Sequence, residues 1–125
     1  MDNGWQKYKR RNAYLPADVV SIARSGDLTF GENFYEQLGR PRGVVLYYNA
    51  QRSAIGIGPA DENEADYFVV SKASRRLGSV RVNTTKFLNY HGIPHEVNQR
   101  FRARIEENGS GPMLVIELAE KQAAR

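Results

Sequence analysis

The chain has 125 residues, 41% of them hydrophobic and 26% charged, which is typical of one soluble globular domain. It contains no cysteine, which excludes disulfides, thiolate metal sites and cysteine nucleophiles and favours a reducing cytoplasm as its location. No apolar run approaches the ~18 residues of a membrane span, and the first residues lack the apolar core of a signal peptide.

Basic residues exceed acidic ones, 18 against 14, and thirteen of the 18 are arginine. They concentrate in the segment Lys7-Tyr8-Lys9-Arg10-Arg11 and in the segment from Lys72 to Arg104. The second segment contains eight cations and a single acid, Glu96. Arginine binds phosphate or carboxylate through two parallel hydrogen bonds. The distribution therefore predicts a surface for a polyanion, with a merely solubilising surface as the alternative.

The first half of the chain predicts an arm followed by a small set of short elements. Residues 1–16 form a polar, basic arm that ends at Pro16. Gly39, with Pro41 beyond it, predicts the end of a short helix, and β-branched or aromatic runs predict strands. The expected elements are the strands Val19–Ala23 and Leu28–Phe30, the helix Phe34–Leu38, and the hairpin of Val44–Tyr48 with Ser53–Ile57.

An acidic linker, residues 61–66, precedes a second half with the same order of elements. Asn83-Thr84-Thr85 can cap its helix. Strict alternation places Val97, Gln99, Phe101, Ala103 and Ile105 on one face of a strand. The expected elements are the strands Tyr67–Val70 and Ser79–Val82, the helix Phe87–Gly92, the strands Val97–Ile105 and Met113–Leu118, and a polar tail, 119–125.

The two halves also share a motif. Phe34–Pro41 reads FYEQLGRP and Phe87–Pro94 reads FLNYHGIP, so Phe, Gly and Pro recur 53 positions apart. A repeat of this period is usually one unit that cannot bury its hydrophobic face alone. The sequence predicts a single domain, residues 17–118, made of two repeats, 17–60 and 67–118. Their strands would form one mostly β barrel, with the short helices as plugs.

This layout resembles the AbrB-like swapped-hairpin family, which includes AbrB, SpoVT, the MazE-type antitoxins and MraZ. The segments Gly26–Phe30, Phe34–Gly39 and Val44–Ile57 are similar to one βαββ half, and Gly78–Val82, Phe87–Gly92 and Val97–Leu118 to another. The resemblance implies a duplicated βαββ barrel in one chain. In the family, basic residues at the turn and first strands contact DNA.

Carried over by position, those residues are Arg24 in the first copy and Arg75, Arg76 and Arg81 in the second. The chain departs from the family pattern just after the turn glycine, where Asp27 and Ser79 replace a basic residue. Asp27 would repel phosphate, so the second copy is expected to be the better DNA-binding half.

Catalytic and metal-binding motifs are not expected. His91 and His95 are four residues apart, but Gly92 and Pro94 end the helix between them, so the two rings would not share a metal. The acidic linker 61–66 lacks the glycine and terminal glutamate of a calcium loop. We therefore expect neither an enzyme nor a bound metal or cofactor.

Arg100, Arg102 and Arg104 alternate along one expected strand and would repel one another without opposing acids or a partner. Glu117 on the returning strand, or Glu106 or Glu107, could pair with them. Salt-bridged surface, contact with a polyanion and a protein interface all remain open for this ladder.

Together these features predict a cytoplasmic, non-enzymatic DNA-binding protein that regulates transcription. The residues expected to contact DNA are Arg24, Arg75, Arg76, Arg81, Lys86, Lys7, Lys9, Arg10 and Arg11, with Arg100, Arg102 and Arg104 as additional basic surface. The alternative, favoured by Asp27 and Ser79, is a protein-interaction module, antitoxin-like or accessory, whose basic face docks an acidic protein. Either a monomer of fused repeats or a homodimer fits the sequence.

Overall fold

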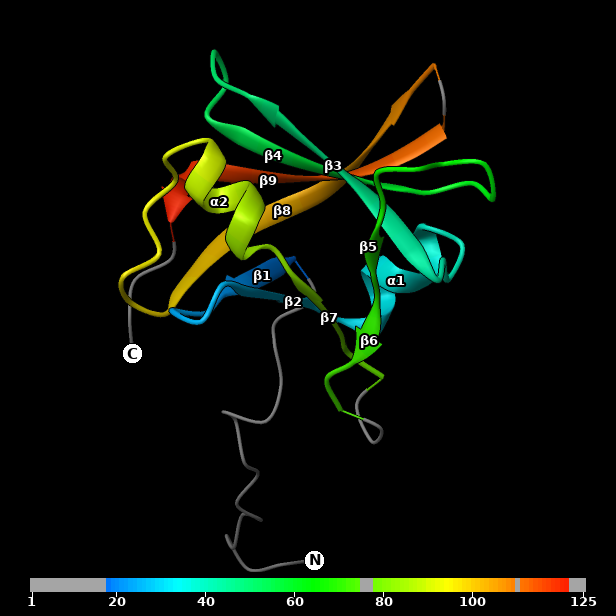
Figure 1. Ribbon diagram of the computed structural model, residues 1–125, viewed down its shortest axis with the longest axis horizontal. Helices are drawn as coiled ribbons and strands as arrows, with labels where there is room; N and C mark the ends of the chain where they lie inside the picture. The colour runs from blue at the N-terminus through cyan, green and yellow to red at the C-terminus, as the bar shows by residue number, and fades with distance from the viewer. Residues whose placement is uncertain (1–17, 75–77, 110, 122–125) are drawn as a thin grey trace, which may run out of the picture.

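The computed structural model describes residues 18–74, 78–109 and 111–121. These residues form one antiparallel sheet that nearly closes into a barrel, with two short helices on opposite sides of it (Figure 1). The predicted mostly β, barrel-like fold is confirmed. In chain order the elements are β1 (Val19–Ile22), β2 (Asp27–Phe30), α1 (Glu32–Gln37), β3 (Gly43–Asn49), β4 (Ala54–Pro59), β5 (Phe68–Val69), β6 (Ser71–Lys72), β7 (Val80–Asn83), α2 (Thr85–Tyr90), β8 (Gln99–Asn108) and β9 (Gly111–Lys121).

The strand order is β5-β3-β4-β9-β8-β1-β2-β7-β6. Only Val70 separates β5 from β6 in the chain, so the two ends of the sheet meet at this segment. The hairpins β3–β4 and β8–β9 lie side by side because β4 pairs with β9, while β2 pairs with β7 on the other side of the barrel.

The core fills the barrel through alternation along each strand. Val20 and Ile22 of β1 and Leu28 and Phe30 of β2 are almost fully buried, and the residues between them face outward. Each helix has six residues, too few to be stable alone. Phe34 and Phe87 anchor the helices in the core, as the sequence predicted, and the complete cluster is Val20, Ile22, Leu28, Phe30, Phe34, Leu38, Val44, Ile55, Ile57, Val80, Val82, Phe87, Leu88, Ile93, Phe101, Ala103, Leu114 and Ile116.

The expected cap of the second helix is wrong for Thr84. Thr84 occupies the cap position, but its hydroxyl donates to the Gly26 carbonyl oxygen at 2.8 Å and bonds no helix amide. Gly26 has φ 92°, and a Cβ there would lie 2.0 Å from Thr85 Oγ1. The side chains at the start of α2 thus fasten the helix to the β1–β2 turn.

Several element boundaries differ from those expected. The strand expected at Tyr67–Val70 is divided into β5 and β6, because it pairs first with β3 and then with β7. β8 begins at Gln99, so Val97 precedes it and is 57% exposed rather than on the inner face. β9 runs to Lys121 and includes residues 119–121 of the expected tail, and Lys121 pairs with Phe101 of β8 across a register shift.

Both helices also begin two residues earlier than expected, α1 at Glu32 and α2 at Thr85. Neither is long and apolar enough to cross a membrane, and no other helix occurs in the described part of the chain.

Candidate functional site

A row of polar side chains crosses the outer surface of the barrel from β8 to β6. Cross-strand register places in line Arg100 (β8), Ser21 (β1), Thr29 (β2), Arg81 (β7) and Ser71 (β6). We call these five residues the outer row. Neighbouring strands are ~4.8 Å apart, so Arg100 and Arg81 are separated by roughly 14 Å of hydroxyl-bearing surface.

The outer row follows directly from strand alternation. Leu28 and Phe30 flank Thr29 and are buried, and Val80 and Val82 flank Arg81 in the same way. Within residues 18–74, 78–109 and 111–121, neither Arg81 nor Arg100 forms an ion pair. Both side chains are exposed, and the described residues leave both guanidinium groups without an ion-pair partner.

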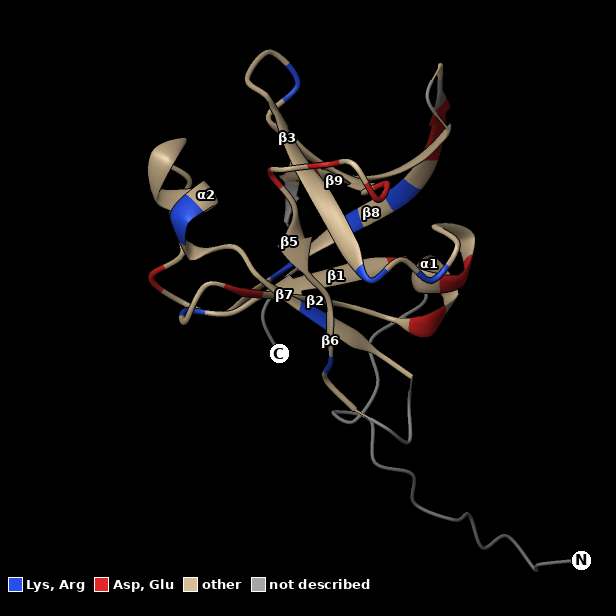
Figure 2. Ribbon diagram, turned by 45° about the vertical axis from the view of Figure 1, so that its right-hand side comes forward, with Lys and Arg blue, Asp and Glu red and all other residues tan. Residues whose placement is uncertain are grey.

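Arg24 and Lys86 lie at the end of the barrel where α2 meets the β1–β2 turn. The Arg24 amide donates to Asn98 Oδ1 at 2.8 Å, and Thr85 Oγ1 donates to the Ser25 carbonyl at 2.9 Å. These bonds fix the backbone of the turn while the side chains of Arg24 and Lys86 stay exposed. Lys86 is on the first turn of α2, and Figure 2 shows basic colouring on that helix.

Asp27 lies on the same outer surface, one rung beyond the outer row. It faces Asn83 across the β2–β7 ladder, and Asn83 Nδ2 donates to Asp27 Oδ1 at 3.0 Å. Ser25 Oγ donates to Asp27 Oδ2 at 3.2 Å. Both bonds come from neutral groups, and among the described residues Asp27 makes no ion pair.

Six of the expected DNA contacts fall outside the described residues. Lys7, Lys9, Arg10 and Arg11 belong to the segment before Asp18, and Arg75 and Arg76 to the connection between β6 and β7. In the chain, the first group precedes β1 and the second joins two strands of the outer row.

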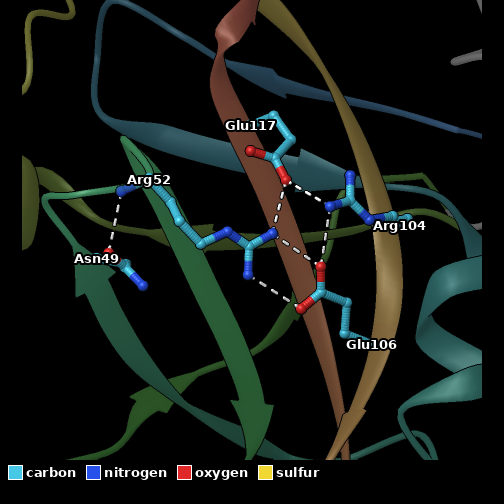
Figure 3. Close-up of polar contacts among 5 residues, drawn as sticks. All are labelled: Asn49, Arg52, Arg104, Glu106 and Glu117. Carbon is cyan, nitrogen blue, oxygen red and sulfur yellow. Dashed lines mark hydrogen bonds and ion pairs between the residues drawn. The ribbon is translucent and has the colours of Figure 1, made fainter.

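The three arginines that alternate along β8, Arg100, Arg102 and Arg104, lie in different environments. Arg104 contacts Glu117 at 2.8 Å and Glu106 at 3.0 Å, and Arg52 of the β3–β4 turn contacts the same two carboxylates (Figure 3). We call these four residues the ion-pair cluster. Arg102 lies 3.8 Å from Asp18, while Arg100 belongs to the outer row. The salt-bridge interpretation thus applies to Arg104, and Glu117 and Glu106 are its partners, as the sequence suggested.

The ion-pair cluster is balanced in charge, because two arginines share two carboxylates. Hydrogen bonds to Glu106 and Glu117 raise the pKa of Arg52 above its ordinary value, and the hydrogen bond from Arg52 lowers the pKa of Glu106. Glu117 is largely covered, with its side chain 11% exposed between the two guanidinium groups. The cluster has little charge left for an external ligand.

The two histidines occupy separate positions. His91 packs against Phe87, Tyr48 and Tyr90 with ring centroids 4.7–4.9 Å apart. The His95 ring nitrogens lie 3.1 Å from the Arg24 carbonyl and 2.9 Å from Asn89 Oδ1. Among the described residues no group of three His, Asp or Glu side chains is placed to hold a metal ion.

Charge and motif patterns in the sequence do not single out the uncharged members of this surface, which are Ser21, Thr29, Ser71 and Asn83. The available signal was alternation, because Ser21 stands between Val20 and Ile22, and Thr29 between Leu28 and Phe30. Alternation predicts that these side chains point outward, but it does not predict which strands lie next to one another.

Comparison with known proteins does not identify a relative. No family model matches the chain, and no curated protein or solved structure matches it. The function must therefore be inferred from the geometry of the chain itself.

Proposed function

We propose that this protein binds duplex DNA through the outer surface of β8, β1, β2 and β7, and that it acts as a transcriptional regulator without enzymatic activity. The observation that carries the proposal is the outer row, in which Arg81 and Arg100 lack ion pairs within the described residues and flank the hydroxyls of Ser21 and Thr29. Arginines and hydroxyls are the side chains that most often contact the phosphates of DNA.

Arg24 and Lys86 extend the same basic surface to the end of the barrel, where both are exposed. If these two residues, Arg81 and Arg100 each neutralise one phosphate, the logarithm of the binding constant falls against the logarithm of salt concentration with a slope of about −4. The segments holding Lys7–Arg11 and Arg75–Arg76 would make the slope steeper.

We also propose that the barrel arose by duplication of a βαββ unit, as the resemblance to the AbrB-like family implies. Corresponding strands of the two halves pair with each other, β2 with β7 and β4 with β9. The remaining contacts are reciprocal as well, because β1 pairs with β8 while β5 pairs with β3. Exchange of the two halves would leave this pairing scheme unchanged, which supports the proposal.

The test is binding of the purified chain to mixed-sequence duplex DNA at 50 and 200 mM salt. Arg81→Ala and Arg100→Ala are each expected to weaken binding to all sequences and to reduce the salt slope by about 1. Arg40→Ala is the matched control, because it removes the same charge from the turn after α1, where Arg40 is bonded to Glu32 and Glu36 of the helix. It should leave both quantities nearly unchanged.

Failure of the wild-type chain to bind DNA at 50 mM salt would refute this function. The same basic surface would then be assigned to the alternative, a protein-interaction module that docks an acidic protein. If Arg81→Ala and Arg40→Ala lose DNA affinity equally, binding depends only on the net charge of the protein, and the outer row is not the contact surface.

A further inference from the structure

The carboxylate of Asp27 is unexpected on a surface that binds phosphate. Phosphate oxygens only accept hydrogen bonds and carry negative charge, so a carboxylate beside them repels them. Arg24 precedes it in the same turn and Arg81 lies on the adjacent strand, yet neither forms an ion pair with it. A surface that bound phosphate alone would bind more tightly with a neutral residue at this position.

The Asp27 side chain is held in a defined orientation by its neighbours. Asn83 Nδ2 and Ser25 Oγ donate to its two oxygens, and Asn83 Oδ1 in turn accepts from the Thr85 amide at 3.4 Å. Each carboxylate oxygen accepts two hydrogen bonds, and an amide nitrogen donates two. The Asp27–Asn83 pair therefore retains carboxylate acceptors and one N–H donor for a ligand.

This pattern of donors and acceptors matches one base edge in the major groove of DNA. Adenine presents N7, which accepts, beside the N6 amino group, which donates. Asn83 can donate to the first and Asp27 can accept from the second. Guanine presents two acceptors, N7 and O6, at the same positions, and the Asp27 carboxylate would repel O6.

The position of the pair is suitable for such a contact. It is the last rung of the β2–β7 ladder, next to the start of α2 and about 7 Å along β7 from Arg81. Arg24 lies three residues before Asp27, in the turn that contacts α2, and Lys86 lies three residues after Asn83, on α2. Arg81 lies two residues before Asn83, on β7. Phosphate contacts on either side would hold a base edge over Asp27 and Asn83.

We infer that the Asp27–Asn83 pair makes the interface sequence-selective by accepting adenine and rejecting guanine at one position of the major groove. This inference rests on the proposed DNA-binding function. It assigns Asp27 the opposite role from its neighbours, because Asp27 lowers affinity for DNA in general and raises discrimination between sequences.

The test is selection from duplexes that carry eight random base pairs between fixed flanks, together with binding of the unselected pool. The wild-type chain should enrich adenine over guanine at one position by at least about fivefold, the low end of the discrimination of a good base contact. Asp27→Asn keeps the shape and the bond to Asn83 but removes the charge. It should bind the unselected pool as tightly as the wild type or more tightly, with adenine enrichment below about twofold.

Asp18→Asn is the matched control, because Asp18 is an exposed acid next to β1 whose nearest described cation is Arg102, at 3.8 Å. It should raise affinity for the unselected pool and leave the preference for adenine unchanged. Equal melting temperatures of the three proteins establish that the fold is intact.

The outcomes separate the two proposals. Binding without preference between adenine and guanine, or the same preference in wild type and Asp27→Asn, overturns the inference and leaves DNA binding in place. Absence of binding to any duplex overturns the DNA-binding function and this inference with it.

Discussion

Arg100 and Arg104 lie on the same strand, four residues apart, and both point outward, yet their surroundings differ. Arg104 forms ion pairs with Glu106 and Glu117 in the ion-pair cluster, whereas Arg100 faces Ser21 and has no ion pair within the described residues. The difference arises from the adjacent strands, because β1 pairs with one edge of β8 over Gln99–Arg102, and β9 pairs with the other edge mainly beyond that point. Arg104 is thus paired because two carboxylates lie within 3.0 Å of it, and no described carboxylate lies at that distance from Arg100.

The largest expected effect is on stability, from a substitution in the β1–β2 turn that bears Arg24. Gly26→Ala would place a Cβ 2.0 Å from Thr85 Oγ1 at a φ of 92°. We expect it to lower the free energy of unfolding by roughly 2–4 kcal/mol, because both the clash and the left-handed backbone penalise the new side chain. Chemical denaturation measures the change.

Gly39→Ala is the control for that substitution. Gly39 has a similar φ of 87°, but a Cβ there would meet nothing within 4 Å. Its expected cost is about 1 kcal/mol, that of backbone conformation alone. Equal costs at the two glycines would show that contact between Gly26 and Thr85 does not hold α2 in place.

An intermediate effect is expected when the ion-pair cluster is opened. Glu117→Gln removes one of the two carboxylates that Arg52 and Arg104 share. The melting temperature should fall by about 4 °C, and DNA binding should gain salt dependence because two guanidinium groups lose part of their neutralisation. Thermal unfolding and the binding assay at two salt concentrations measure these changes.

The control for the cluster is Glu107→Gln, which changes the net charge equally. Glu107 is exposed and forms no ion pair with the described residues. If both variants gain DNA affinity to the same extent, general charge accounts for the gain and Arg104 was not masked by Glu117.

The smallest effect concerns pH. The bond from Arg52 lowers the pKa of Glu106 in the folded state below its ordinary value of 4.5. The stabilisation is therefore complete above pH 4.5 and is lost as the pH falls through the lower, folded-state pKa. Between pH 5 and pH 3 the melting temperature of the wild type should fall further than that of Glu106→Gln, by about 1–2 °C. Parallel curves for the two proteins would contradict an effect of this ion pair on stability.

Local patterns predicted much of the fold. Alternating apolar residues gave strands close to β1, β2, β3, β4 and β7, and Phe34 and Phe87 were correctly expected to anchor short helices. The errors occur where contact with a segment distant in the chain decides the local structure. Thr84 bonds a turn 58 residues away instead of capping its helix, and the segment around Val70 divides between two neighbouring strands.

The candidate site was predicted only in part. Arg24, Arg81 and Lys86 could be named because their charge is visible in sequence, and Glu117 could be proposed as a partner for the ladder. Ser21, Thr29 and Asn83 could not be selected from among many polar residues. Their place beside Arg81, Arg100 and Asp27 depends on which strands pair with one another.

The sequence by itself determined the periodicity of the strands, the short plugged helices and the excess of arginine, since each depends on residues close together in the chain. Only the tertiary structure decided which of the described arginines form ion pairs with other described residues and which do not. Cross-strand register joins Arg81 to Thr29 and Asp27 to Asn83 over more than fifty residues, and pairing of β8 with β9 brings Glu117 to Arg104. Register depends on the packing of the whole core, because a shift of one residue in any strand would exchange its buried and exposed side chains.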